Sequence, residues 1–198
     1  MNRQQSSILL QRARDGSSEA VDAILGQVGG RLLALIRLRL GKPLRAHLES
    51  RDILQATMLK AFQRFDQFEG AGGKSFVGWL AAIAQNEIRD QVDYHHRNKR
   101  DAALNVALED NQLAAHVRSQ VSLIQLERDT QQLEEALERL DETYREVIIL
   151  RKLEELSFAE IAQKMGRSSE ACRKLLARAM TALSQTMYEL RQRHAPAR

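Results

Sequence analysis

The sequence predicts an all-α protein with two small helical domains joined by a linker. Only two prolines occur in 198 residues, and the chain is rich in Ala, Leu, Glu, Gln and Arg, which lose little side-chain freedom in a helix. Apolar residues recur at spacings of three and four, without the alternation typical of strands. These observations divide the chain into a first domain over 1–100, a linker over 101–130, a second domain over 131–190 that contains a helix-turn-helix, and a basic tail over 191–198.

Charge is distributed unevenly along the chain. The formal net charge is +4, but residues 1–100 carry 16 basic and 10 acidic side chains, and residues 161–198 carry 8 and 2. Two positive segments are compatible with a polyanionic partner. Residues 131–160 instead carry 4 basic and 9 acidic side chains, which we interpret as the solvated surfaces of two helices.

Composition argues against several classes of protein. The one cysteine, Cys172, cannot form an internal disulfide and has no Cys or His at the spacing of zinc ligands, so we expect no oxidised scaffold and no metal site. The N-terminal residues lack an apolar signal core, and Arg37 and Arg39 interrupt the most apolar run, 32–40. We therefore expect a cytoplasmic protein without membrane insertion. No nucleophile–base pair or carboxylate pair is recognisable, so we expect neither an enzyme nor a bound cofactor.

Two short helices and a connection are expected at the start of the chain. The first helix covers 7–14 and ends at Asp15-Gly16, and the second starts from an N-cap at Ser17 or Ser18. Residues 41–50, with the sequence GKPLRAHLES, are expected to form a connection.

The stretch from 52 to 66 predicts an amphipathic helix with Asp52 as its N-cap. Its apolar stripe consists of Leu54, Met58, Ala61, Phe62 and Phe65. The opposite face places one leucine in solvent among polar side chains: Asp52, Gln55, Leu59, Gln63 and Asp66. A lone exposed leucine is common on protein surfaces, and a docking face for a partner helix is the alternative interpretation.

A longer helix is expected after the glycine-rich loop 68–74, with Ser75 as its N-cap. Trp79 falls within its apolar stripe, which favours a core position over a base-stacking role. The other members of this stripe are Phe76, Leu80, Ile83 and Ala84. Further along the helix, polar and basic side chains share a second face: Asn86, Arg89, Asp93, His96, Arg97 and Arg100.

The second domain begins with two helices separated by an N-cap at Asp141, and residues 156–180 then predict a helix-turn-helix. Gly166 lies where the turn needs a positive φ, Ser157 and Ser168 can each cap the helix that follows, and Cys172 is expected to be buried. In this motif the second helix enters the major groove of DNA. Its candidate contacts to bases and phosphates are Arg167, Ser168, Ser169, Glu170, Arg173, Lys174 and Arg178. An ordinary helical hairpin with a basic surface is the alternative.

Three segments carry a resemblance to a known family: DILQATMLKAF (52–62), SFVGWLAAIAQNEIRD (75–90) and LERLDETYREVIILRKLEELSFAEIAQKMG (137–166). In their order and spacing they resemble the extracytoplasmic-function (ECF) sigma factors of the sigma-70 family, which are promoter-specificity subunits of bacterial RNA polymerase. The likeness covers most of the chain. It implies a factor that binds core RNA polymerase and directs sequence-specific promoter recognition, DNA melting and transcription initiation. It also implies an inhibitory anti-sigma partner.

The resemblance also implies roles for particular residues. The helix-turn-helix contacts named above would read the upstream promoter element. A start-site-proximal element would be contacted by Asn86, Arg89, Arg97, Lys99 and Arg100. Polymerase would be contacted by Asp52, Gln55, Leu59 and Gln63.

Two other functions stay open at this point. A dimeric helix-turn-helix repressor or activator would bind duplex DNA unaided as a symmetric dimer, whereas a sigma factor needs core polymerase. A helical adaptor would bind only protein, and substitution of Arg173 and Lys174 would then leave DNA binding and transcription unchanged.

Overall fold

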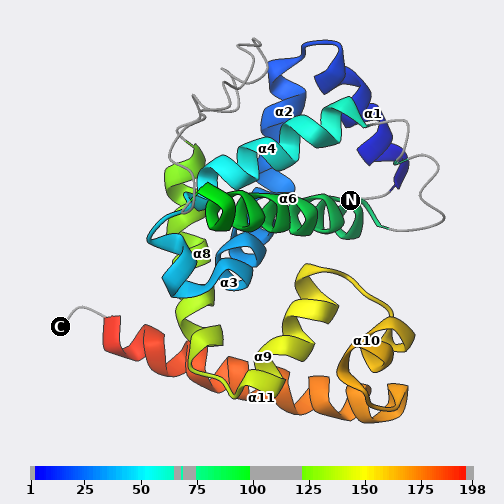
Figure 1. Ribbon diagram of the computed structural model, residues 1–198. Coiled ribbons are helices and arrows are strands. Elements are labelled where there is room, and N and C mark those ends of the chain that lie inside the picture. Colours follow the sequence, from blue (N-terminus) through cyan, green and yellow to red (C-terminus); the bar gives the residue numbers. More distant parts are fainter. Residues whose placement is uncertain (1–2, 65–67, 69–74, 99–121, 195–198) are drawn as a thin grey trace.

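The computed structural model of the protein describes residues 3–64, 68, 75–98 and 122–194, and the regular structure in these ranges is helical (Figure 1). The N-terminal half contains α1 (Arg3–Arg14), α2 (Ser18–Ile24), the π-helical turn η1 (Leu25–Gly29), α3 (Gly30–Arg45), α4 (Ser50–Gln63) and α6 (Phe76–Asn98). The C-terminal half contains α8 (Ser122–Glu138), α9 (Glu142–Ile148), the π-helical turn η2 (Ile149–Leu153), α10 (Phe158–Met165) and α11 (Ser169–His194). The all-α fold class is confirmed. The expected linker lies outside the described residues from 101 to 121.

The core of the N-terminal half forms around α3, whose Leu33, Leu35 and Ile36 are fully buried. Helices α4 and α6 pack against α3 and against each other. The Trp79 ring lies 5.2 Å from the Phe68 ring between centroids, and Trp79 is buried. The interpretation of Trp79 as a core residue is therefore confirmed.

Several helix boundaries follow local hydrogen bonds that the sequence predicts. Ser17 accepts from the backbone of Ala20, Gly78 N donates to Ser75 Oγ at 3.0 Å, and Thr143 N donates to Asp141 Oδ1 at 2.9 Å. This last hydrogen bond also lowers the pKa of the Asp141 carboxyl. The three expected N-caps are confirmed, and each satisfies a backbone donor at a helix start.

Other boundaries differ from the expectation. α1 begins at Arg3, and α3 extends into the expected connection, where Gly41 at φ 65° breaks the helical conformation shortly before Pro43. α4 begins at Ser50 with Glu49 in the N-cap position, so Asp52 is not the cap. Asp52 lies in the first turn instead, where a carboxylate still interacts favourably with the helix dipole.

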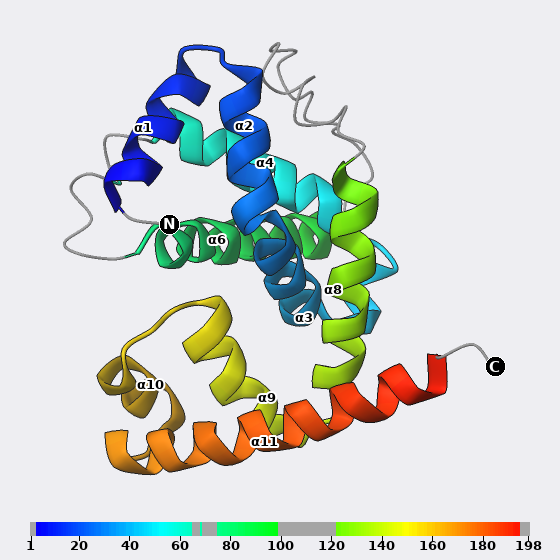
Figure 2. The same ribbon diagram turned by 180° about the vertical axis from the view of Figure 1, so that it is seen from behind.

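The two halves meet where α8 lies beside α3 and where η2 lies against α3 and α6 (Figures 1 and 2). Ile149 and Leu153 of η2 are 3% and 5% exposed, and both pack with the core of the N-terminal half. Glu134 and Glu154 are also buried here. The expectation that the acidic surfaces of 131–160 are solvated is therefore wrong for these two residues, because arginines of α3 draw their carboxylates into the contact, whereas Asp141, Glu142 and Glu160 are exposed as expected.

Within the described ranges, no helix combines the length and hydropathy that a bilayer crossing requires.

We expect Gly166→Ala to lower the free energy of unfolding by about 1–2 kcal/mol, measured by equilibrium urea denaturation. Gly166 ends α10 at φ 63°, a left-handed conformation that costs a residue with a Cβ about that much. No heavy atom lies within 4 Å of the added Cβ, so the loss comes from the backbone alone. Gly26→Ala is the matched control, because its Cβ also enters open space but its φ is not positive. Equal losses in the two variants would contradict this explanation.

Candidate nucleic-acid and polymerase interfaces

The helix-turn-helix consists of α10, the turn 166–168 and the N-terminal part of α11. Ser157 and Glu160 form a capping box at the start of α10, in which Ser157 N donates to Glu160 Oε2 at 2.8 Å and Glu160 N donates to Ser157 Oγ at 3.3 Å. At the start of α11, Ala171 N donates to Ser168 Oγ at 3.1 Å. Both expected caps are confirmed, and each fixes where a helix begins.

Packing then fixes how α10 and α11 cross. Ile161 and Cys172 are fully buried in the core of the C-terminal half, which confirms the expectation for Cys172. Ser169 Oγ donates to the backbone oxygen of Phe158 at 3.3 Å. The guanidinium carbons of Arg151 and Arg173 each lie 5.1 Å from the centroid of the Phe158 ring, a cation–π distance. The first turns of α10 and α11 are therefore held together.

The seven candidate upstream contacts lie on the turn and on the N-terminal part of α11. Ser169 is half-buried, and the other six are exposed: Arg167, Ser168, Glu170, Arg173, Lys174 and Arg178. Glu170 Oε2 lies 3.3 Å from Arg173 Nη1, and Glu170 Oε1 lies 3.8 Å from Lys174 Nζ. These cations form a surface that can contact phosphates and guanine acceptors.

Part of the start-site-proximal set lies on α6. Asn86 and Arg89 are exposed, and Arg89 Nη1 donates to Asn86 Oδ1 at 3.5 Å. Arg97 falls within α6, but its side chain lies outside the described residues, as do Lys99 and Arg100 entirely.

The candidate polymerase contacts lie on one face of α4. Asp52 and Gln63 are exposed, whereas Gln55 and Leu59 are half-buried. The expectation that Leu59 projects into solvent is therefore wrong. On a helix surface, residues four positions away are neighbours, so Gln55 and Gln63 are placed to cover part of this leucine.

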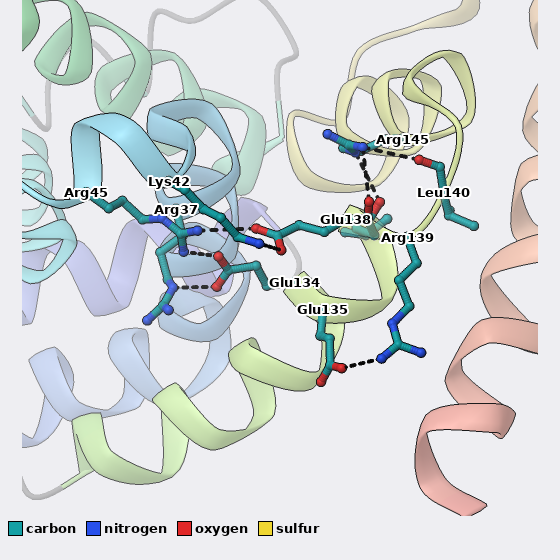
Figure 3. Close-up of polar contacts among 10 residues, drawn as sticks. Arg37, Lys42, Arg45, Glu134, Glu135, Glu138, Arg139, Leu140 and Arg145 are labelled. Atoms are coloured by element: carbon teal, nitrogen blue, oxygen red, sulfur yellow. Dashed lines mark hydrogen bonds and ion pairs between the residues drawn. The ribbon is translucent and has the colours of Figure 1, made fainter. Parts of the chain in front are cut away.

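A cluster of ion pairs joins α3 to the C-terminal half, and we call it the α3 ion-pair cluster. Figure 3 shows Arg37, Lys42 and Arg45 of α3 directed toward α8. Arg37 Nε donates to Glu134 Oε2 at 2.6 Å, and Arg45 also pairs with Glu134. Nearby, Lys42 Nζ lies 2.8 Å from Glu138 Oε2. The full cluster comprises Arg31, Arg37, Arg39, Lys42 and Arg45 of α3 with Glu134, Glu138, Glu146, Glu154 and Glu155.

Arg39 makes the most extensive contacts of the cluster. Its Nη1 and Nη2 atoms donate to the two carboxylate oxygens of Glu146 at 2.8 and 3.0 Å, and its Nε donates to Glu154 Oε1 at 2.9 Å. Burial by itself lowers the pKa of Arg39, but the hydrogen bonds to Glu146 and the charge of Glu154 raise the pKa overall. The charged guanidinium of Arg39 is thus matched by two carboxylates, through hydrogen bonds to both of them.

Arg31 and Ser75 both bind Glu155. Arg31 Nη2 donates to Glu155 Oε1 at 2.8 Å, and Ser75 Oγ donates to Glu155 Oε2. Burial by itself raises the pKa of this carboxyl, but the hydrogen bonds from Ser75 and Arg31 outweigh it, so the pKa of Glu155 is lowered overall. The residue that caps α6 is thus tied to the C-terminal half.

Sequence reasoning missed this cluster, although a signal for it was present. Residues 1–100 carry an excess of basic side chains and residues 131–160 an excess of acidic ones. Opposite net charges on two segments of one chain are the pattern expected of complementary surfaces.

The described residues offer no evident metal centre, because no group of three His, Cys, Asp or Glu side chains is placed to hold an ion. A cavity of about 210 Å³ lies between α6 and the C-terminal half, and Ser75, Gly78, Gln85, Glu154 and Lys164 are among the residues that line it. Because its walls come from both halves, its shape depends on their relative placement.

Comparison with known proteins accounts for both halves. Sigma-70 region 2 matches residues 26–100, and Sigma-70 region 4 matches residues 130–183. RNA polymerase sigma factor NccH of Alcaligenes xylosoxydans xylosoxydans is 30% identical over 186 residues, which span 90% of this chain and 94% of that protein. RNA polymerase sigma factor CarQ of Myxococcus xanthus is 29% identical over 181 residues, which span 91% of this chain and 97% of that protein. Among solved structures, CnrH in complex with the cytosolic domain of CnrY is 23% identical and covers 93% of this chain and 98% of that one, with a TM-score of 0.45.

The region 2 match contains α4 and all of α6, and the region 4 match contains the helix-turn-helix. A dimeric repressor or activator is not favoured, because its N-terminal half would have no reason to match region 2. The chain belongs to the sigma-70 family and is an ECF sigma factor, a subunit that binds core RNA polymerase and directs promoter recognition and transcription initiation.

Proposed function

We propose that this sigma factor divides its task among three surfaces. The exposed face of α4 docks on core polymerase, the polar face of α6 contacts the start-site-proximal element, and the N-terminal part of α11 reads the upstream element. The observation that carries this proposal is the exposed group of cations at the start of α11, which follows two well-formed caps and a left-handed turn.

For the upstream element, Arg173 and Lys174 are the principal contacts. A guanidinium can reach both acceptors of a guanine, and an ammonium binds a guanine or a phosphate. Their neighbours extend this surface to the DNA backbone: Arg167, Ser168, Ser169, Glu170 and Arg178. Glu170 accepts from a cytosine amino group or orients the two cations.

For the start-site-proximal element, Asn86 and Arg89 lead the set, followed by Arg97, Lys99 and Arg100. Melting follows when unstacked bases are captured, and it requires no covalent chemistry by this chain. RNA synthesis then belongs to polymerase, and the sigma factor itself is not an enzyme. Its place of action is the cytoplasm, and an anti-sigma partner holds it inactive until a signal arrives.

Polymerase makes this division of labour effective. Each DNA surface alone binds largely by counterion release, with little selectivity. When both surfaces are docked on one polymerase, binding of one element raises the effective concentration of the other surface at its own element.

The direct test is run-off transcription with purified core polymerase and genomic fragments. We expect specific transcripts when the chain and polymerase are both present. Tight binding of a palindrome by the chain alone, with no directed initiation, would instead support a symmetric DNA-binding dimer.

We expect Leu59→Asp to weaken association with core polymerase by about tenfold, because only the exposed part of this half-buried leucine is left to bury and full burial of a leucine is worth about 1.5–3 kcal/mol. Affinity would be measured by competition for polymerase, and folding by circular dichroism. Ile8→Asp on α1 is the matched control, since Ile8 is 55% exposed and lies outside the proposed docking face. Unchanged affinity of a folded Leu59→Asp variant would rule out this contact.

We expect Arg173→Ala to reduce discrimination at one upstream base pair by about 1–3 kcal/mol, the range for a good base contact. Binding of the polymerase complex would be compared across promoters that differ at single positions. Arg191→Ala, an exposed arginine near the end of α11, is the matched control. Equal weakening on all sequences would assign Arg173 to a phosphate rather than a base.

A further inference from the structure

We propose that Lys60 is a positioning residue for promoter binding. From α4 it neutralises two carboxylates of α6, Glu87 and Asp90, so that the adjacent face of Asn86 and Arg89 can receive a DNA strand. We call these three charged residues the Lys60 bridge. The inference rests on the proposed role of α6 at the start-site-proximal element, and it adds to that role a residue that does not itself contact DNA.

The first step is the charge of the part of α6 that is proposed to face the promoter. Residues 86–93 have the sequence NEIRDQVD, with one basic and three acidic side chains. A DNA strand presents a row of phosphates, and like charges that face each other across an interface are unfavourable. This part of α6 therefore binds phosphates poorly unless a cation from another element balances its carboxylates.

The second step is the position of that cation. Helix α4 packs beside α6 (Figures 1 and 2). Lys60 Nζ forms an ion pair with Glu87 and lies 3.5 Å from Asp90 Oδ2. Residues three positions apart are neighbours on a helix surface, so one ammonium group reaches both carboxylates. Burial by itself lowers the pKa of Lys60, but its pairs with Glu87 and Asp90 outweigh burial, and the pKa is raised overall.

The third step is the burial of Glu87. Its side chain is 5% exposed, and it follows Ile83 and Ala84 at helical spacing in the buried stripe of α6. Gln91 Nε2 donates to Glu87 Oε1 at 3.2 Å, and Lys60 supplies the balancing charge. Loss of one partner from a buried pair leaves an uncompensated charge. Lys60 therefore fixes how this side of α6 lies against α4.

The fourth step is the place of the Lys60 bridge between two proposed binding surfaces. Successive residues of a helix differ in direction by about 100° around its axis. Leu59 belongs to the proposed docking face of α4, whereas Lys60, the next residue, is directed toward α6. On α6, the exposed Asn86 directly precedes the buried Glu87. The bridge thus connects the helix that docks on polymerase to the helix that contacts the promoter.

The test uses the full chain assembled with core polymerase and a promoter recovered by run-off transcription. Fluorescence anisotropy of the labelled promoter gives its affinity, competition for core polymerase gives the affinity for the enzyme, and urea denaturation gives the stability. In Lys60→Met we expect promoter affinity to fall roughly fivefold, since one unit charge at contact distance in water is worth about that factor. We expect the affinity for polymerase to stay at the parent level.

Neutralising a carboxylate in the Lys60→Met background separates charge from structure. Adding Glu87→Gln removes the unpaired buried charge and returns this surface to its parent net charge, so we expect promoter affinity close to the parent level. Adding Asp90→Asn instead makes the same correction at a side chain that is 65% exposed. Exposed pairs add little stability, so Asp90→Asn should restore promoter affinity without restoring the stability that Lys60→Met loses. A bridge that only stabilised the fold would change the two quantities together.

Glu87→Gln alone tests the opposite direction. Lys60 is kept and still pairs with Asp90, while this surface carries one acidic charge fewer than in the parent chain. We expect severalfold tighter promoter binding, although an ion pair is lost. Weaker binding by this variant would contradict the proposed role of the charge.

Lys152→Met is the matched control. It makes the same change of charge at an exposed lysine of η2, outside the three proposed surfaces. We expect it to keep the parent affinities for promoter and polymerase.

Parent-level promoter affinity in Lys60→Met would overturn the proposal. A loss that persists in both double variants would also overturn it, because Lys60 would then contact DNA or polymerase directly. Glu87→Gln and the Lys60→Met/Glu87→Gln variant contain no unpaired buried charge, so they decide the question even if Lys60→Met does not fold. Failure of the proposed role of α6 is distinguishable, since Asn86→Ala and Arg89→Ala would then leave promoter affinity unchanged as well.

Discussion

The contact of Arg39 with Glu146 and Glu154 is the interaction on which the observed placement of the two halves most depends. It joins one arginine of α3 to two carboxylates of the C-terminal half. Glu146 lies in α9, and Glu154 directly follows η2. Because Glu154 is almost fully buried, the two halves cannot separate at this point without hydrating three charges. The apolar contacts of Ile149 and Leu153 then fill the space beside it.

Sequence predicted those features of the fold that depend on neighbouring residues. The caps at Ser75, Asp141 and Ser157 and the left-handed turn at Gly166 each involve hydrogen bonds or torsions within a few positions, so residue type and spacing specify them. The N-cap of α4 was mispredicted at Asp52, which lies two positions beyond the true first residue, Ser50. An aspartate is favourable both as an N-cap and within the first turn, so residue type alone does not separate the two positions.

The contact between the halves could not be predicted in the same way. Arg39 lies 107 positions from Glu146 and 115 from Glu154, and no periodicity relates residues at such distances. The net charges of the segments indicated complementary surfaces, but only the packing of α8 on α3 identifies the pairs. For the candidate site, residue types predicted the exposed cations of α11, whereas the partial burial of Leu59 depends on neighbouring side chains.

The position of Arg173 above Phe158 has a consequence for how tightly the upstream promoter element can be held. A guanidinium that packs on an aromatic ring at an exposed site gains about 0.5–1 kcal/mol. A contact between Arg173 and a base pair has to offset the loss of this cation–π interaction. Arg151 shares the ring, so Phe158 keeps one cationic neighbour when Arg173 moves to DNA, and the start of α10 stays anchored while the reading side chain exchanges partners.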